Sequence, residues 1–241
     1  MTRLSININK IALLRNSRGR NFPDVQAFAE RCLALGAHGI TLHPRPDQRH
    51  ARFDDIQPLR DICRQHGKEL NIEGFPSPDF LDAVIQAHPS QCTLVPDAPS
   101  QLTSDHGWSL QGKQDQLRST IHELKSAGIR VSLFMDYDSP DIAIAKELGA
   151  DRIELYTEPY AMSYGTANQS NMLNCFRDAA QLAQRAGLGV NAGHDLNMDN
   201  LELFLSINNI LEVSIGHAFV VECIQHGVEH VVKRYLSIVE R

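Results

Sequence analysis

The sequence has no long apolar run, no excess of positive charge and no paired cysteine motif. No uninterrupted apolar segment approaches the roughly 18–20 residues that span a bilayer, and the amino-terminal stretch MTRLSININK lacks the apolar core of a signal peptide. The net charge of −6 argues against a nucleic-acid-binding protein that relies on bulk positive charge. We therefore expect a soluble, cytoplasmic protein without a membrane or nucleic-acid partner.

The cysteines are few, odd in number and scattered, and no Cys-x-x-Cys occurs. They are Cys32, Cys63, Cys92, Cys175 and Cys223. Four of them stand in apolar helix or strand patterns, which predicts buried thiols rather than disulfides or zinc ligands.

A glycine-rich loop after the first strand is also missing, because NINKIALLRNSRG follows there. This argues against a doubly wound nucleotide-binding sheet, which is the main rival fold. Eight short segments rich in Ile, Leu and Val predict strands at 4–8, 39–43, 69–74, 92–96, 130–136, 152–157, 188–193 and 212–217. None shows clean alternation along its whole length, which suits parallel strands covered on both faces.

Helical patterns separate these strands. We predict helices at 23–35, 77–87, 114–128, 139–150, 174–187, 200–207 and 229–240. Phrases such as ALGAHGITL, ELGADRIEL and RAGLGVNA repeat a helix, a glycine stop and a strand. Eight such units in 241 residues predict a single domain, 1–241, of the α/β class: a (β/α)8 TIM barrel.

Two longer irregular segments, 97–112 and 158–170, each follow a predicted strand. Loops of this length in a compact domain are often functional. We predict that the segment around Trp108 is a lid over the active site. The alternative is a loop packed in place by this tryptophan, which is the only one in the chain.

Polar residues gather at the predicted carboxyl ends of the strands, where barrel active sites lie. His43, His194 and His217 follow three different strands and should converge with Glu73. Glu73 stands between Ile72 and Gly74, so burial should raise its pKa and suit it to acid–base chemistry. The alternative for Glu73 is an ion pair with Arg45 or Lys10.

Two glycine elements, NAGHD and SIGHA, follow the seventh and eighth strands. In barrels, backbone N–H groups at these loops and at a following helix terminus often bind phosphate. Gly193 and Gly216 would let the backbone approach such a group, and AFVVECI supplies the helix. We therefore predict a small phosphorylated substrate.

A metal centre is not expected, although several histidines and Glu73 are ligand types. Metal-binding barrels often carry His-x-His after the first strand, where this chain has Asn7-x-Asn9 followed by Lys10. Lys10 is the only lysine near a strand end, so a Schiff-base aldolase acting on a phosphosugar is the leading enzymatic alternative.

The segments NINKIALLRNSRG, GITLHPRPDQRH, LNIEG, LVPD, VSLFMD, GLGVNAGHDL and SIGHA, in this order, resemble the pyridoxine 5′-phosphate synthase family. The resemblance implies condensation of 1-deoxy-D-xylulose 5-phosphate with 3-amino-2-oxopropyl phosphate to pyridoxine 5′-phosphate, phosphate and water. It also implies no metal or organic cofactor, helices beyond the basic eight, and a homooctamer. A barrel that only binds pyridoxal phosphate is a further alternative.

The resemblance also implies roles for residues. His43 is expected to accept a proton, Glu73 to act as a second acid–base group, and His194 to donate a proton to the departing phosphate. Substrate-binding positions are Asn7, Asn9, Lys10, Arg18, Arg45, His50, Thr103, Asp195, Gly216 and His217. This chain departs from the family's best-known members at Asn9-Lys10, where they have Asp-His, and at Asp195, where they have glycine.

Overall fold

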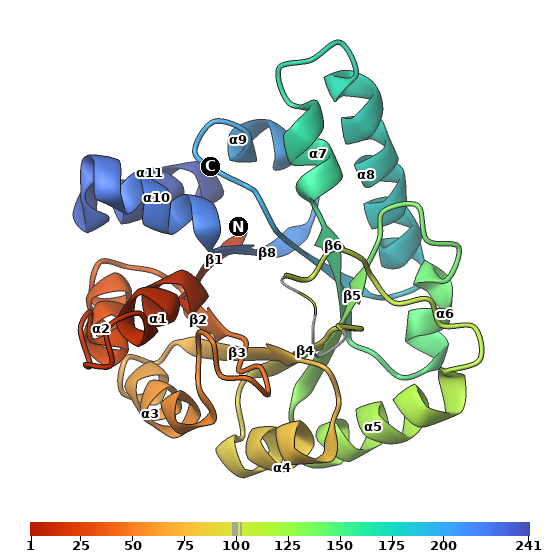
Figure 1. Ribbon diagram of the computed structural model, residues 1–241. Helices are drawn as coiled ribbons and strands as arrows, with labels where there is room; N and C mark the ends of the chain where they lie inside the picture. The colour runs from red at the N-terminus through yellow and green to blue at the C-terminus, as the bar shows by residue number, and fades with distance from the viewer. Residues whose placement is uncertain (98–100, 102) are drawn as a thin grey trace.

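Eight parallel strands close into a barrel in sequence order, with β8 paired to β1 (Figure 1). The computed structural model describes residues 1–97, 101 and 103–241. The strands are β1 (Arg3–Asn7), β2 (Gly39–Leu42), β3 (Glu69–Gly74), β4 (Gln91–Leu94), β5 (Arg130–Met135), β6 (Arg152–Tyr156), β7 (Gly189–Gly193) and β8 (Ile210–Ile215). The predicted (β/α)8 fold is confirmed, and all eight strand predictions match to within about two residues at each end.

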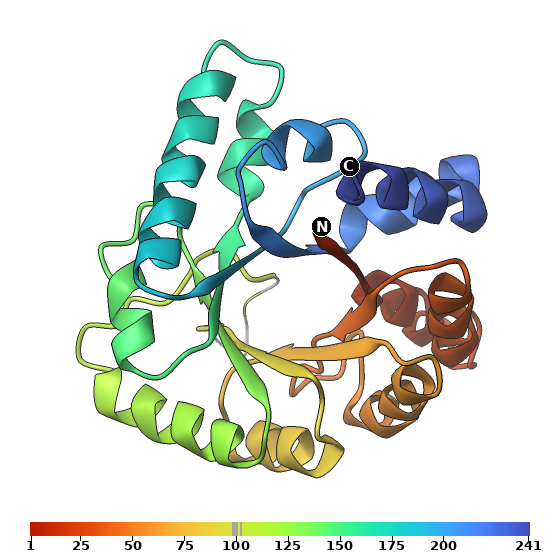
Figure 2. The same ribbon diagram turned by 180° about the vertical axis from the view of Figure 1, so that it is seen from behind.

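Helices surround the barrel on all sides (Figure 2). They are α1 (Asn9–Asn16), α2 (Val25–Ala34), α3 (Ile56–Gln65), α4 (Pro78–Ala87), α5 (Gln114–Ser126), α6 (Ile142–Glu147), α7 (Glu158–Ser163), α8 (Gln169–Arg185), α9 (Leu201–Phe204), α10 (His217–His226) and α11 (Val228–Val239), with a short 3₁₀ turn at Phe53–Asp55. The extra helices are α1, α7 and α10. The chain ends meet where Thr2 N–H donates to the Val239 carbonyl, 3.3 Å away.

Three helices differ from the sequence predictions. The segment 158–170 is not one irregular loop: α7 occupies its first part, with Pro159 in the first helical turn. α1 was not expected because it exposes Leu13 and Leu14, which blurs its apolar face. α3 was also missed, although its apolar residues recur at helical spacing. α4 begins with a side-chain N-cap, since Ser77 Oγ accepts from Phe80 N–H.

The strands do alternate, contrary to the reading of the sequence. Most of their apolar side chains face the helices and join one large core cluster, while most of the intervening polar side chains fill the barrel interior. Phe134 of β5 and Tyr156 of β6 form a separate small cluster with Val95. Gln91 of β4 donates to Glu212 of β8 at 3.4 Å and accepts from Asn191 of β7 at 3.3 Å. In the barrel β4 is adjacent to neither β7 nor β8, so both hydrogen bonds must cross the barrel interior. The interior is therefore polar, and the strand register places charged groups at both of its ends.

The indole of Trp108 belongs to the apolar core and is 4% exposed. Its Nε1–H donates to the Leu94 carbonyl at 2.9 Å, and its backbone N–H donates to the Phe134 carbonyl at 2.8 Å. The prediction of a lid centred on Trp108 is therefore wrong, and the packed-loop alternative describes this part of the segment. Residues 98–100 and 102 of this segment lie outside the described residues.

All five cysteines are free, but only three of them are buried, so the prediction of buried thiols is wrong for Cys175 and Cys223, which are partly exposed. No helix in the described ranges is long and apolar enough to cross a membrane.

Candidate active site

His43 follows β2 directly and is 6% exposed. Its backbone N–H donates to the side-chain oxygen of Asn9 at 2.9 Å, so the first turn of α1 fixes the end of β2. The imidazoles of His43 and His50 lie edge to face, with ring centroids 6.0 Å apart. The two histidines of GITLHPRPDQRH thus meet at the barrel mouth.

These histidines are held in the neutral form. Burial lowers the pKa of His43 well below its usual value, and the charges of Arg45 and Arg49 add to the effect. Burial and the same two arginines lower the pKa of His50 to about 4, with a further contribution from Lys10. A neutral imidazole among cations can accept a proton from a substrate, which a protonated one cannot do.

Glu73 stands at the carboxyl end of β3 and is 9% exposed. Burial raises its pKa to about 8, the charges of Asp97 and Glu212 add to the rise, and Arg45 opposes it. Among the described residues, its carboxyl group accepts one hydrogen bond, from the Asn7 amide at 3.5 Å. The ion-pair alternative is not observed, because the Arg45 guanidinium pairs with Asp97 instead. A carboxyl group with a pKa near 8 can both take up and release protons at neutral pH.

A second carboxyl group, Glu154 of β6, lies in the barrel interior and is 2% exposed. Burial raises its pKa well above the usual value, and the charges of Glu73 and Glu212 raise it further. Its Oε2 has no hydrogen-bond partner among the described residues. A Cβ atom at Gly193 would collide with Oε1 of Glu154, so the glycine of NAGHD makes room for this carboxyl group. Glu73 and Glu154 therefore titrate as a coupled pair.

The Arg45 guanidinium is buried and connects β2 to the segment after β4. It pairs with Asp97, which also accepts from Ser104 Oγ at 2.7 Å. Arg45 Nη1 donates to the Gln101 carbonyl at 3.2 Å, and Arg49 donates to the same oxygen. In the described part of the chain, the Nε groups of both arginines lack an acceptor. Two N–H groups are thus available to an anion, beside guanidinium groups that also contact Asp97 and Asp47.

His194 stands in a strained turn after β7, with φ of 80°, and Asp195 follows with φ of 59°. Left-handed backbone at residues other than glycine is uncommon and clusters at functional sites. The hydroxyl of Thr157 donates to the carbonyls of Gly193 and His194 and holds this turn. The imidazole packs against Phe134 and Tyr156, at centroid distances of 5.5 and 5.3 Å. Burial lowers its pKa, although the nearby Asp195 charge opposes this.

Gly216 lies beside Asn7, since a Cβ atom at Gly216 would stand 3.2 Å from the Asn7 Cβ. It is the N-cap of α10, and His217 is the first residue of that helix, with an exposed side chain. The positive end of this ten-residue helix therefore opens next to β1.

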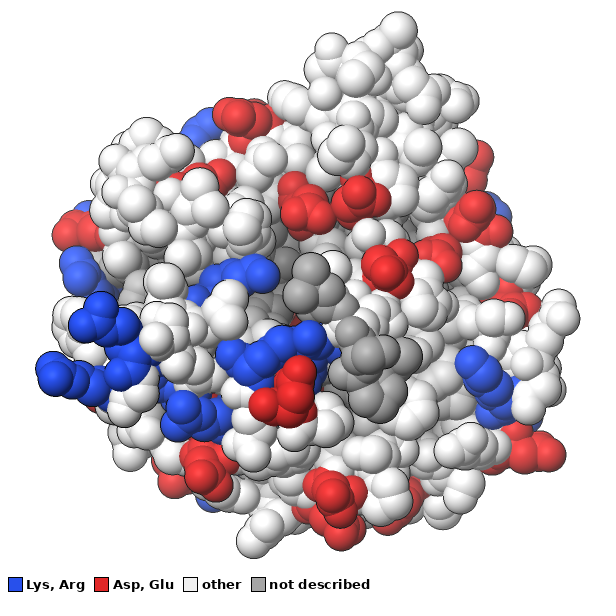
Figure 3. Space-filling model, viewed as in Figure 1, with Lys and Arg blue, Asp and Glu red and all other residues white. Residues whose placement is uncertain are grey.

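The other predicted site residues lie further out. Lys10, in the first turn of α1, is half-buried and near enough to lower the pKa values of both His50 and His194. Arg18 lies in the turn after α1 and Thr103 in the β4–α5 segment; both are exposed, and no described contact joins either side chain to His43, Glu73 or His194. Figure 3 shows positive side chains over the α1 and β2 side of this face and negative ones toward β6 and α7.

Sequence reasoning missed the role of several residues. They are the carboxyl groups of Asp97, Glu154 and Glu212 and the aromatic pair Phe134 and Tyr156. The alternation Ile153-Glu154-Leu155, with a charged residue between two apolar ones, is the signal that predicts a carboxyl group inside the barrel.

Comparison with known proteins identifies the family of the chain. The family model described as pyridoxal phosphate biosynthesis protein PdxJ matches residues 4–241. The chain belongs to this family. A pyridoxine 5′-phosphate synthase of Xanthomonas campestris pv. campestris (strain B100) is 51% identical, covering 99% of this chain and 96% of the relative. A pyridoxine 5′-phosphate synthase of Parabacteroides distasonis is 47% identical, covering 98% of each chain.

Solved structures with much lower identity share the fold. The thiamine phosphate pyrophosphorylase of Pyrococcus furiosus has a TM-score of 0.64 at 13% identity, with 99% of this chain and 95% of that chain covered. A mutant tryptophan synthase α-subunit from the same organism has a TM-score of 0.65 at 14% identity, with 100% and 98% covered. These similarities confirm the barrel and do not bear on its chemistry.

Proposed function

We propose that this single-domain PdxJ-family chain acts as a pyridoxine 5′-phosphate synthase. It condenses 1-deoxy-D-xylulose 5-phosphate with 3-amino-2-oxopropyl phosphate to give pyridoxine 5′-phosphate, inorganic phosphate and water. The observation that carries the proposal is the combination of neutral His43 and His194 with Glu73, whose pKa of about 8 lies close to neutrality. Imine formation, dehydration and ring closure are mainly proton transfers, which these groups can perform.

The roles follow from the electrostatics. His43 is neutral and buried among cations, so it accepts protons. Glu73 exchanges protons in both directions, and Glu154 is a second buried carboxyl group coupled to it. His194 is neutral without ligand, so it must gain a proton before it can donate one. A phosphate dianion nearby would raise the pKa of His194 and favour that uptake.

Anion binding is divided between two regions of the mouth. Arg45, Arg49 and His50 form one, on the β2–α3 loop. Gly216 and His217, at the amino terminus of α10, form the other region. Asn7, at the end of β1, lies beside Gly216. Lys10, Asn9, Arg18, Thr103 and Asp195 complete the proposed substrate-binding set. Because the second substrate brings its own amine, the reaction needs no enzyme lysine. The family resemblance implies that it also uses no metal or organic cofactor.

The direct test incubates the purified protein with both substrates and follows the absorbance of a pyridine ring together with released phosphate. We expect one phosphate per ring, and no ring when either substrate is omitted. Absence of a pyridine product with both substrates present would contradict the proposal.

Lys10 separates this reaction from the aldolase alternative. With 1-deoxy-D-xylulose 5-phosphate and borohydride alone, the protein mass should stay unchanged, because the ketone awaits the amine of the other substrate. Lys10→Met should weaken substrate binding without abolishing turnover. A reduced adduct mapped to Lys10 would favour the aldolase.

We further propose that the protein acts in the cytoplasm as a homooctamer, as the family resemblance implies. Exposed apolar side chains support self-association: Leu13 and Leu14 of α1 are 42% and 45% exposed, and Ile224 of α10 is 75% exposed. Light scattering should give eight copies per particle, and Ile224→Asp should reduce that number.

A further inference from the structure

The carboxyl end of α1 is bonded to the loop that follows β2. The side-chain amide nitrogen of Asn16 lies within hydrogen-bond distance of three backbone carbonyl oxygens of that loop, which share its two N–H groups: Gln48 at 3.1 Å, Arg49 at 3.0 Å and His50 at 2.7 Å. Arg15 Nη2 also donates to the His50 carbonyl at 3.3 Å. One helix end therefore satisfies three consecutive carbonyl groups of an irregular segment.

Arg15 is itself held rigidly. It is 5% exposed, and its two Nη atoms lie 2.5 and 2.9 Å from the two carboxylate oxygens of Asp55. Its Nε–H donates to the Asn16 side-chain oxygen at 3.0 Å, which orients the Asn16 amide with its nitrogen toward the loop. Asp55 also accepts from the Arg52 backbone N–H at 2.7 Å. Only a guanidinium has the forked donors for this set of acceptors.

The loop needs this support because its own backbone is unfavourable. Gln48 has φ of 51°, in the left-handed region. The orientation of the His50 ring also depends on this backbone, since its Nδ1 accepts from the Ala51 N–H at 2.9 Å. Arg49, two residues before Ala51, reaches the Gln101 carbonyl across the mouth. A shift of the loop backbone would move the His50 and Arg49 side chains together.

We propose that Arg15 and Asn16 are positioning residues that set the affinity of the mouth for phosphorylated substrates by fixing the β2–α3 loop. They act through Arg49 and His50 and perform no proton transfer. The identity of the substrates rests on the proposed function, whereas the loop geometry does not. The rival explanation is a clamp that only stabilises the fold.

The test compares Asn16→Ala with Asn171→Ala. Asn171 is an exposed residue of α8 whose amide also bonds a neighbouring side chain, Asn168 at 3.3 Å, so it is a matched control. Asn16→Ala should raise KM for at least one of the two substrates about tenfold or more, which corresponds to one lost hydrogen bond or more. The kcat value should change by less than about threefold. Asn171→Ala should change neither.

A second measurement does not depend on turnover. Backbone amide exchange of residues 47–52 should become faster in Asn16→Ala, while exchange in α8 stays unchanged. Arg15→Lys keeps the charge opposite Asp55 but loses the fork, and it should shift KM and exchange in the same direction.

The outcomes are distinct. Unchanged KM and unchanged exchange in Asn16→Ala overturn the proposal, as does a lower melting temperature with both unchanged. If the wild-type protein makes no pyridine product, the proposed function fails. In that case the exchange data and the affinity of each variant for inorganic phosphate still decide whether the clamp positions the anion site.

Discussion

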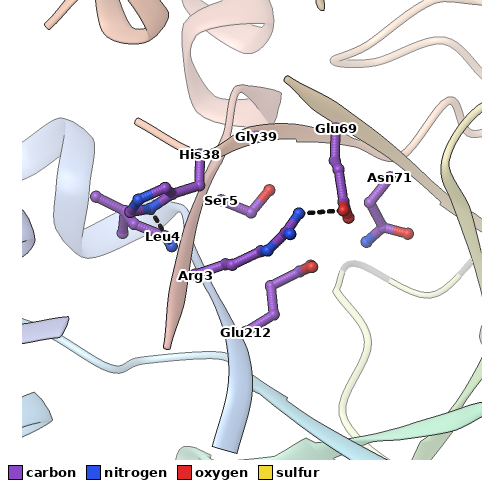
Figure 4. Close-up of a pocket in the computed structure, with 8 residues that line it drawn as sticks. All are labelled: Arg3, Leu4, Ser5, His38, Gly39, Glu69, Asn71 and Glu212. Carbon is purple, nitrogen blue, oxygen red and sulfur yellow. Dashed lines mark hydrogen bonds and ion pairs between the residues drawn. The ribbon is translucent and has the colours of Figure 1, made fainter. Parts of the chain in front are cut away.

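Glu69 and Glu73 lie four positions apart on the same face of β3, yet their surroundings are opposite. Glu69, at the amino-terminal end of the barrel, pairs with both Arg3 and Arg130. Figure 4 shows Arg3 pointing to Glu69 in a small pocket of this end. Glu73, at the mouth, receives one long bond, from the amide of Asn7. The Glu69 carboxylate is paired with two arginines, whereas Glu73 holds a proton that it can exchange with a substrate.

The pKa directions express this difference. Burial alone would raise the pKa of Glu69, but the hydrogen bond from Arg130 and the charges of Arg130 and Arg3 lower it. For Glu73, burial and neighbouring carboxyl groups raise the pKa to about 8. A buried charged residue is therefore a candidate for catalysis when its partners are missing, and a structural element when they are present.

The largest expected effect is on turnover at the mouth. Glu73→Gln keeps the shape of the side chain and removes its proton exchange, so kcat should fall by about 100-fold or more. The melting temperature should not fall, because no ion pair is lost. Steady-state kinetics with both substrates measures the change, and near-native kcat would remove Glu73 from the mechanism.

A glutamate-to-glutamine substitution at the amino-terminal end of the barrel should change the stability of the protein rather than its turnover. Glu69→Gln leaves Arg3 and Arg130 without their shared anion, which should cost about 2–3 kcal/mol of the free energy of unfolding. Turnover should stay within about twofold of wild type, because Glu69 lies at the far end of the barrel. Urea unfolding and kinetics on the same preparation check both parts. A loss of activity comparable to that of Glu73→Gln would erase the distinction between the two ends.

The strands were predictable because each is a short segment rich in Ile, Leu and Val, and because a glycine often marks the end of the helix before it. The convergence of His43, Glu73 and the His194 turn was predictable once the barrel was inferred, since the carboxyl ends of its strands share one face. The partners of these residues were not predictable, because Arg45 can reach either Glu73 or Asp97. Only the three-dimensional packing decides that choice.

The segment around Trp108 illustrates a second limit. Its composition, with Ser, Asp, Gly and one tryptophan, is equally typical of a mobile lid and of a packed loop. The burial of the indole and its bond to the Leu94 carbonyl distinguish the two, and neither leaves a periodic pattern in the sequence. The fixation of the β2–α3 loop by Asn16 was hidden for the same reason.

The two carboxyl groups should also give opposite pH dependences of stability. Above pH 4.5 the unfolded chain ionises Glu73 while the folded protein keeps it neutral up to about pH 8, so its contribution is lost as the pH rises. Glu69 has a lowered pKa, so its contribution is present above the usual value and lost as the pH falls below it.

Urea unfolding between about pH 3 and pH 8 tests this difference, because the range covers the fall from Glu73 above pH 4.5 and the loss from Glu69 below it. Glu73→Gln should remove a fall of at most about 1.4 kcal/mol per pH unit, part of which is shared with Glu154. Glu69→Gln should leave that fall in place and flatten the dependence below pH 4.5. Identical pH profiles for the two variants would show that the ends of the barrel do not differ as described.

The smallest effect concerns the turn that carries His194. Asp195→Gly restores the residue that the best-known family members have, at a φ of 59° that glycine adopts without strain. Stability should change by less than about 1 kcal/mol, because relief of strain is offset by the greater freedom of the unfolded chain.

Loss of the carboxylate also removes a charge that raises the pKa of His194 and repels phosphate. The Kd for inorganic phosphate, from calorimetry, should therefore fall by about two- to fivefold, under 1 kcal/mol. Asn209→Gly is the matched control, since Asn209 has the same φ of 59° just before β8, at the opposite end of the barrel. An equal change in phosphate affinity in both variants would mean that the Asp195 charge does not act at the mouth.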